Sequence, residues 1–420
     1  MKFYIYFLLI NSVLALNSGI KITKNLISPK PICQEGIDNT IKVLESGKLF
    51  RYGVDREDSY VSKVEKEFAQ VVNKKNALCV NSCSSAIVLG LKLLGANDGD
   101  EILTNGFTFT AVPSSIMRLN CKPILVDTTK DFTISLEDLE YKMKNSKAKI
   151  LALSHMRGYI TDMDKILSLC QKYNVILFED CAHCAGVMWK NKPVGINSIA
   201  AYSTQSDKII NSGEGGILAL NDDDMFAKAI YLSGCYEEQY VKHHVDSKID
   251  FEKIINYQPN WSMRMTELTA AVLLPQIKNM NRDIKIWTKN YNLLCNIITK
   301  GTDKIYIPKS HENANKIGDH INFSFEQNEE NNALFFKLVK ELGVPIKWLQ
   351  SNTNARWYKN WEKYGVEKYS LPGTDKLLAK SYDMKLGLDL TEKDINNIGK
   401  IIVYAAEKTS SKSKIWMRWG

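Results

Sequence analysis

The chain has 420 residues, of which 45% are hydrophobic and 24% are charged, and this is typical of a soluble globular protein that buries a sizeable core in one large domain or in two to three smaller ones. The net charge of +8, from 55 Lys and Arg against 47 Asp and Glu, is spread along the chain in short runs, which favours a solvated surface over a nucleic-acid-binding patch. The nine cysteines are odd in number, which argues against a disulfide framework in so long a chain.

The first residues, 1–18, combine one lysine with an apolar run from Phe3 to Leu16. This run is too short to span a bilayer comfortably, so we expect no stable membrane span. It fits either the apolar part of a signal peptide, with a small-residue cleavage site at 13–15, or a leading strand or helix of the fold. We leave these residues out of the fold prediction. The protein is cytoplasmic by default, and secretory or organellar if the segment is a signal.

From about residue 58 the sequence alternates between helical and strand patterns. Apolar residues at helical spacing predict one helix from Val61 to Val71 and another from Ser84 to Leu94. A third helix is expected over Asp162–Tyr173. Short apolar segments predict strands, with one ending near Val80 and others at 101–104, 123–126, 149–154, 175–178, 199–203 and 216–220. This alternation predicts an α/β fold whose sheet is mixed but mainly parallel and covered on both faces.

The pattern changes after about residue 265. A long helix is predicted from Thr266 to about Met280, followed by fewer strands, more Asn and Lys, and a last helix over Glu392–Lys408. We therefore predict a large α/β domain over residues 27–265 and a smaller α+β domain over residues 266–420.

Small hydroxyl residues follow the strand that ends near Val80, in the segment Asn81 to Ala86. Ligands of open α/β sheets bind where strands end at their carboxyl edge. Free amide groups at the start of the next helix can bind a phosphate there. Ordinary N-capping by Ser84 or Ser85 explains the same residues.

Two further segments carry candidate chemistry. Asp180 lies just past an apolar strand, where its carboxylate can either hold a protonated pyridine nitrogen or cap a turn. Lys208 is followed by the glycine-rich run Gly213 to Gly216. A buried lysine loses its proton readily and can form an imine with an aldehyde, whereas an ordinary lysine lies on the surface. Cys181 and Cys184 form a single C-x-x-C, which without a second such pair is only a weak sign of redox or zinc chemistry, and we expect no metal centre.

The joint arrangement of these segments resembles the DegT/StrS family of sugar aminotransferases, which are fold-type I enzymes dependent on pyridoxal 5′-phosphate (PLP). The segment from Ser203 to Lys208, followed by Gly213 to Gly216, is similar to the family's cofactor-lysine motif. Glu179-Asp180 with His183 and Gly186 is similar to its cofactor-ring motif. Further segments match in order at 107–109, 126–127, 158–164, 264–267 and 270–271.

The resemblance implies an aspartate-aminotransferase-like large domain and a role for each matched residue. Lys208 would hold PLP as a Schiff base and move the proton, and Asp180 would pair with the pyridine nitrogen. His183 would lie near the ring hydroxyl, where relatives often carry Gln. Phe109 would stack on the ring face.

The phosphate end departs from the family pattern. Cys83, Ser84 and Ser203 would hold the phosphate, although relatives usually have Gly-Thr where this chain has Cys83-Ser84. Relatives also commonly supply an Asn from the partner subunit of a homodimer with interface active sites. That position is Ser262 here, with Asn260 two residues earlier, and the sequence leaves open which of them reaches the phosphate.

The resemblance further implies transfer of an amino group from L-glutamate or L-glutamine to a keto-cyclitol or keto-sugar. The segment Ser154 to Gly158 is more similar to the cyclitol branch than to the branch acting on nucleotide-linked keto-sugars, which stays as an alternative. A catalytically silent PLP-binding regulatory protein is a second alternative. Arg51, Arg157 and Arg264 are candidates for a clamp on a substrate carboxylate or phosphate, or for surface ion pairs.

Overall fold

The computed structural model describes residues 19–245, 250–251, 254 and 260–410. The predicted leader at 1–18 lies outside these residues. Among the described residues, no helix combines the length and the apolar character that crossing a lipid bilayer requires.

A seven-stranded sheet forms the centre of the large α/β part, with the strand order β1-β9-β8-β5-β4-β2-β3. Its strands are β1 (Asn76–Val80), β2 (Glu101–Asn105), β3 (Lys122–Val126), β4 (Ile150–Ser154), β5 (Ile176–Asp180), β8 (Ile199–Ser203) and β9 (Gly216–Leu220). Strands β3, β2, β4, β5 and β8 pair in parallel, whereas β9 is antiparallel to both of its neighbours. The prediction of a mixed, mainly parallel sheet is confirmed, and the predicted strands at 199–203 and 216–220 match in full.

Helices cover both faces of this sheet because its strands are apolar on both sides. One core joins the sheet to α3, α6 and α7, and a second core joins it to α4, α5 and α8. The helices are α3 (Tyr60–Val71), α4 (Cys83–Leu93), α5 (Ala111–Arg118), α6 (Leu136–Asn145), α7 (Met163–Tyr173) and α8 (Asp223–Ser233). Strand residues alternate between the two cores, so that Leu177 faces the first and Phe178 the second.

The C-terminal part is built on a four-stranded antiparallel sheet, in the order β10-β11-β13-β12. Its elements are β10 (Ile305–Tyr306), β11 (His320–Phe325), α10 (Glu329–Glu341), β12 (Lys347–Trp348), the 3-10 helix η4 (Tyr358–Tyr364), α11 (Pro372–Leu378), β13 (Ser381–Lys385) and α12 (Glu392–Ser410). The predicted α+β character is confirmed. The exact division of the chain at residue 265 stays a prediction.

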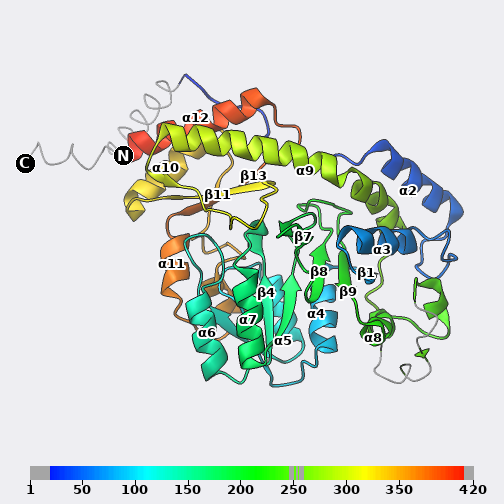
Figure 1. Cartoon of the computed structure of the whole chain (residues 1–420). Coiled ribbons are helices and arrows are strands. Elements are labelled where there is room, and N and C mark those ends of the chain that lie inside the picture. Colours follow the sequence, from blue (N-terminus) through cyan, green and yellow to red (C-terminus); the bar gives the residue numbers. More distant parts are fainter. Residues whose placement is uncertain (1–18, 246–249, 252–253, 255–259, 411–420) are drawn as a thin grey trace, which may run out of the picture.

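The long helix α9 (Glu267–Gly301) joins the two parts. In Figure 1 it crosses the whole molecule, from α2 (Gln34–Ser46) and α3 at one end to α12 at the other. We expected this helix to end near Met280. It continues to Gly301 because Trp287, Leu294 and Ile298 extend its apolar face into the first core.

The remaining short elements are the hairpin β6 (Met188–Trp189) and β7 (Lys192–Pro193), and the 3-10 helices η1 (Met156–Gly158) and η2 (Gln239–Lys242). The segment η1 follows β4 directly, so it lies at the carboxyl edge of the large sheet. This edge carries the candidate site.

Candidate active site

A cavity of about 290 Å³ lies at the carboxyl ends of β4, β5 and β8, beside the start of α4. Parallel strands bring their carboxyl ends to one edge of a sheet, and the loops that follow them enclose the cavity. Seven of the eight residues that we predicted for the cofactor line it, namely Cys83, Ser84, Phe109, Asp180, His183, Ser203 and Lys208. Asn260 does not line the cavity of its own chain.

Lys208 reaches the cavity from a closed loop between β8 and β9. The loop is closed because the amide of Thr204 donates to the carbonyl oxygen of Gly215 at 3.0 Å and the amide of Ser206 donates to that of Gly213 at 3.0 Å. Gly213 and Gly215 both have positive φ, and a Cβ on Gly215 would lie 2.3 Å from Thr204 Oγ1. The glycine run is therefore needed to close the loop that holds the lysine.

Burial, together with the positive charges of Arg157 and Arg356 and against the opposing effects of Cys83 and Asp180, lowers the pKa of Lys208 to about 8. Its Nζ lies 3.0 Å from Nε2 of His183. An amine with this pKa is neutral in a substantial fraction of molecules near neutral pH, and the neutral amine is the nucleophile.

His183 is buried, and burial together with the charge of Lys208 holds its pKa well below the usual range. The ring is therefore neutral. Its Nδ1 is buried and has no hydrogen-bond partner among the described residues. A buried ring nitrogen without a partner is uncommon and indicates a missing ligand group.

Asp180 is the last residue of β5 and faces the cavity. Ser154 Oγ donates to its Oδ2 at 2.7 Å, and the amide of Ala182 donates to its Oδ1 at 3.1 Å. Thr108 Oγ1 in turn donates to Ser154 Oγ at 2.7 Å, which fixes the carboxylate. Burial nevertheless raises the pKa of Asp180, so a cationic partner in the cavity would stabilise its ionised form.

The start of α4 offers backbone amides to the cavity. Ser82 caps the helix, and its Oγ accepts from the amide of Ser85 at 3.1 Å, so the alternative that Ser84 or Ser85 is the N-cap is wrong. The amides of the first turn have no partner inside a helix. The amides of Cys83 and Ser84 are therefore available to a ligand, and both residues line the cavity. An anion is stabilised at such a position by the amides and by the helix dipole.

The sequence profile of the DegT/DnrJ/EryC1/StrS aminotransferase family matches residues 32–403. The chain belongs to this family.

Curated relatives share about three residues in ten with the chain. The spore coat polysaccharide biosynthesis protein SpsC of Bacillus subtilis is 30% identical over 254 residues, which are 60% of this chain and 63% of that protein. The putative L-glutamine:3-amino-2,3-dideoxy-scyllo-inosose aminotransferase of Micromonospora echinospora is 29% identical over 58% of this chain and 56% of that protein. The chain thus spans less than two thirds of the length of these two relatives.

Solved structures show the same fold along nearly the whole chain. That of 3-amino-5-hydroxybenzoic acid synthase has a TM-score of 0.78 at 22% identity, with 91% of this chain and 99% of that chain covered. An aminotransferase from Psychrobacter cryohalolentis has a TM-score of 0.77 at 24% identity, with 90% and 98% covered. The predicted fold of the DegT/DnrJ/EryC1/StrS family is therefore confirmed.

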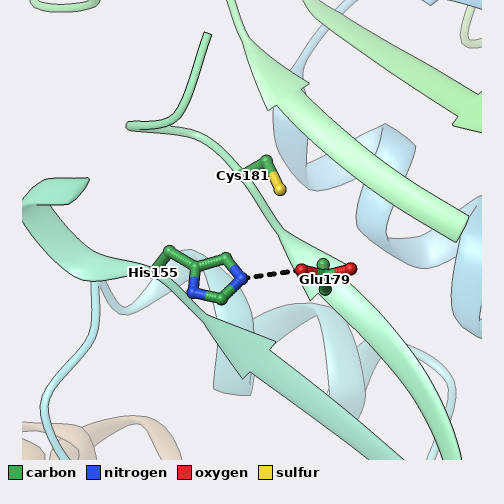
Figure 2. A group of neighbouring side chains, drawn as sticks. All are labelled: His155, Glu179 and Cys181. Carbon is green, nitrogen blue, oxygen red and sulfur yellow. Dashed lines mark hydrogen bonds and ion pairs between the residues drawn. The ribbon is translucent and has the colours of Figure 1, made fainter. Parts of the chain in front are cut away.

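A second cluster of buried side chains lies on the other face of β5 and consists of His155, Glu179 and Cys181 (Figure 2). Nε2 of His155 lies 2.9 Å from one Glu179 oxygen, and Ser198 Oγ donates to the other at 2.7 Å. The Glu179 oxygens are therefore already engaged by the protein. Burial also keeps the pKa of the Cys181 thiol well above its usual range, which argues against a reactive thiol in the C-x-x-C.

The three arginines proposed from sequence have different positions. Arg157 lines the cavity. Arg51 is buried away from it, where its Nη2 pairs with Glu65 at 3.0 Å. Arg264 donates to the carbonyl oxygen of Gly234 at 2.5 Å and to Ser262 Oγ at 2.8 Å, and it does not line the cavity.

Two site residues were missed by the sequence reading. Ser154, at the end of β4, holds Asp180, and its position at a strand end was the available signal. Arg356 lines the cavity from the loop that precedes η4. Nothing in its local sequence distinguishes this arginine from a surface residue.

Proposed function

We propose that the protein is a PLP-dependent aminotransferase that transfers an amino group from L-glutamate or L-glutamine to a keto-sugar or keto-cyclitol. The observation that supports this proposal most strongly is a half-buried lysine with a pKa of about 8, in contact with a neutral histidine and in the same cavity as a buried carboxylate. The lysine and the carboxylate are the two groups that a PLP site needs for the Schiff base and the pyridine nitrogen, and they occur here in a family named for aminotransferases.

The cavity residues fit the cofactor at each end. The amides of Cys83 and Ser84, with the hydroxyl of Ser203, would hold its phosphate. Asp180, whose pKa is raised by burial although its hydrogen bonds and the charge of Lys208 lower it, would hold the protonated ring nitrogen. Phe109 would cover a ring face. When bound, PLP supplies a reactive aldehyde and an electron-withdrawing ring. A structural neighbour, the putative sugar aminotransferase Spr1654 of Streptococcus pneumoniae, has been solved in PLP and PMP forms.

Lys208 would carry the proton during the reaction. Its amine, displaced by the amino donor, would take the proton from the donor Cα and deliver it to C4′ of the cofactor. A pKa near 8 suits both steps, because the group gives and accepts protons readily at working pH. His183 stays neutral at that pH and orients the amine through the 3.0 Å contact.

The acceptor class rests on the relatives. Their names include an L-glutamine:amino-dideoxy-scyllo-inosose aminotransferase, a 3-amino-5-hydroxybenzoate synthase and GDP-perosamine synthases. These names support keto-cyclitols and keto-sugars, and the nucleotide-linked branch stays as the alternative. A screen of glutamate and glutamine against keto-cyclitols and nucleotide-linked keto-sugars, read by mass, would decide between the branches.

The covalent anchor can be tested directly. The protein is incubated with PLP, reduced with borohydride and digested, and the labelled peptide is identified by mass. We expect the label on Lys208 and its loss in Lys208→Ala. Lys316 is an internal control, because burial of its amine also lowers its pKa to about 8 but it does not line the cavity. Label on Lys316, or label that persists in Lys208→Ala, would contradict the assignment.

Turnover distinguishes an enzyme from a silent PLP-binding protein. A functional aminotransferase changes the absorbance of its bound cofactor when glutamate or glutamine is added. A protein that binds PLP through Lys208 but shows no change with either amino acid would refute the aminotransferase proposal and support the regulatory alternative.

We also propose a homodimer. The outer face of α2 exposes Ile37, Ile41 and Leu44, with exposed fractions of 42%, 46% and 55%, and Leu49 and Phe50 follow it. Apolar residues gathered on an exposed helix face are typical of a protein interface. Asn260 and Ser262 are exposed and do not line the cavity of their own chain, which supports a role for one of them at the phosphate of the partner subunit.

A further inference from the structure

Two arginines line the cavity beside Lys208 without a role in holding the cofactor. Arg157 comes from η1, directly after β4, and Arg356 comes from the loop between β12 and η4. The proposed phosphate and ring contacts use neither of them. Their guanidinium groups must therefore be explained separately.

The backbone of Arg157 is held in an unusual conformation. Its φ of 58° and ψ of 20° lie in the left-handed region, which residues with a side chain rarely adopt. The buried Nζ of Lys316 donates to the carbonyl oxygen of Arg157 and lies 3.7 Å from the centre of the Tyr159 ring. These contacts hold the turn that presents the arginine to the cavity.

Arg356 is held at the cavity by the start of α5. The amide of Thr110 donates to the carbonyl oxygen of Ala355 at 3.0 Å. The guanidinium of Arg356 lies 5.8 Å from the centre of the Phe109 ring, which also lines the cavity. The arginine is therefore on the side of the cavity where Phe109 is expected to face the cofactor.

Both guanidinium groups have hydrogen-bond donors to spare. Arg157 is only 3% exposed, and it donates from Nη2 to Asp383 Oδ2 at 2.7 Å, but its Nε is buried without a partner. The Nε of Arg356 is also buried without a partner, and its side chain makes no ion pair with any described residue. Buried donors without acceptors are unfavourable, and a ligand oxygen would satisfy them.

The charges around the cavity point to the kind of ligand. The lining carries Lys208, Arg157 and Arg356 as positive groups and Asp180, Asp207 and Glu214 as negative groups. Asp383 already pairs with Arg157, and Asp207 pairs with Lys385 at 3.0 Å, so Arg356 is left without an ion-pair partner among the described residues. Burial and the charge of Arg157 lower the pKa of Arg356 to about 10. An anion at Arg356 would relieve this repulsion. The planar guanidinium matches the two oxygens of a carboxylate.

We propose that Arg157 and Arg356 together bind a carboxylate of the substrate beside Lys208, either that of the amino donor or one carried by the acceptor. This inference rests on the proposed aminotransferase function, which brings carboxylate-bearing substrates to this cavity. Arg157, fixed by Asp383 and Lys316, gives the site its position. Arg356, which makes no ion pair with any described residue, offers its charge to the ligand.

The inference can be tested by binding without turnover. Glutarate, an unreactive dicarboxylate, and glutaramide, its neutral analogue, are titrated into the PLP-loaded protein by calorimetry. We expect glutarate to bind and glutaramide to bind far more weakly. Arg356→Gln should weaken glutarate about tenfold or more, as expected for a lost charged hydrogen bond. Arg118→Gln, at an exposed arginine of α5, is the matched control and should leave glutarate binding unchanged.

A second variant protects the test against misfolding. Arg356→Lys keeps the charge but loses the planar fork, so it should weaken glutarate less than Arg356→Gln does. Circular dichroism and the dissociation constant of PLP, measured on the same samples, should match those of the unmodified protein. PLP affinity that falls along with glutarate affinity would instead assign the arginine to the cofactor phosphate and overturn the proposal, as would unchanged glutarate affinity in Arg356→Gln.

The source of the carboxylate follows from the first half of the reaction. If it belongs to the donor, Arg356→Gln should raise the glutamate concentration that gives half-maximal cofactor conversion, with little change in the limiting rate. If it belongs to the acceptor, the glutamate concentration that gives half-maximal cofactor conversion should stay unchanged although glutarate binding is weaker. Either result supports the clamp. If no amino donor converted the bound cofactor, the aminotransferase function would be refuted. Glutarate binding would still report on the arginines.

Discussion

At the scale of single residues, the chemistry of Lys208 depends on its surroundings. An exposed lysine has a pKa of about 10.4 and is almost wholly protonated at neutral pH. Burial of the amine, followed by the charges of Arg157 and Arg356, brings the pKa of Lys208 to about 8. The arginines that we assign to substrate binding therefore also favour the neutral, nucleophilic form of the lysine.

This pKa predicts how cofactor attachment depends on pH. Because only the neutral amine attacks the aldehyde, the rate of covalent PLP attachment should rise with pH and level off with a midpoint near 8. Stopped-flow absorbance from about pH 6 to pH 12 measures it, and Nα-acetyl-lysine in the same buffers, with its midpoint near 10.4, is the control. A protein midpoint near that of the free amine would show that Lys208 is exposed.

At the scale of elements, strand alternation separates two polar groups. Ser154 and Asp180 are paired in the register of β4 and β5, and they share the face that bears the cavity. Glu179 points to the opposite face, where it bonds His155. Neighbouring residues of a strand face opposite sides. The carboxylate of Asp180 therefore faces the cavity, and that of Glu179 faces the core.

The contact between β9 and α4 gives a test at this scale. A Cβ on Gly216 would lie 2.4 Å from the carbonyl oxygen of Ser82 and 2.5 Å from the amide nitrogen of Cys83. Gly216→Ala must therefore shift the start of α4. We expect it to weaken PLP about tenfold or more and to destabilise the fold by about 1–3 kcal/mol.

The control for this test is in the same helix. A Cβ on Gly90 would lie 2.2 Å from Phe178 Cε2, in the second core. Gly90→Ala should lower the unfolding temperature but leave the PLP affinity of the folded protein nearly unchanged. Equal loss of PLP affinity in both variants would mean that general destabilisation, and not the phosphate site, explains the effect.

At the scale of the whole molecule, the cavity is shared by both parts of the chain. Arg157 of η1, which follows β4 of the large sheet, pairs with Asp383 of β13 at 2.7 Å, and both side chains are 3% exposed. Arg356 also comes from the C-terminal part. Since α9 runs through both parts and packs into the main core, it helps to fix the distance across which these residues meet.

The proposed dimer is tested on the exposed face of α2. The double variant Ile41→Glu with Leu44→Glu places two charges where we expect an apolar interface, so it should convert the dimer to a monomer by sedimentation and weaken PLP binding. Tyr141→Glu, at a 65% exposed residue of α6, is the control and should stay dimeric. An unmodified protein that sediments as a fully active monomer would refute the interface.

The sequence by itself predicted the large sheet and most of the residues that we propose for the cofactor and that line the cavity. Short apolar strands reveal a parallel sheet because they are buried on both faces, and residues at strand ends, such as Asp180 and Ser203, fall at one edge by geometry. The glycine run after Lys208 marked a closed loop. The predicted end of α9 near Met280 is too early. The residues after Met280 are largely polar, so the apolar face that continues to Gly301 is evident only from its packing.

Only the tertiary structure decided which arginines belong to the cavity. Three arginines were equal candidates in the sequence, yet Arg51 pairs with Glu65 in the interior and Arg264 bonds Gly234, whereas Arg157 lines the cavity. Arg356 was not a candidate at all. Local sequence patterns do not predict contacts between distant segments, because these contacts form only when the two sheets pack together through α9. The pKa of Lys208 depends on the same long-range contacts.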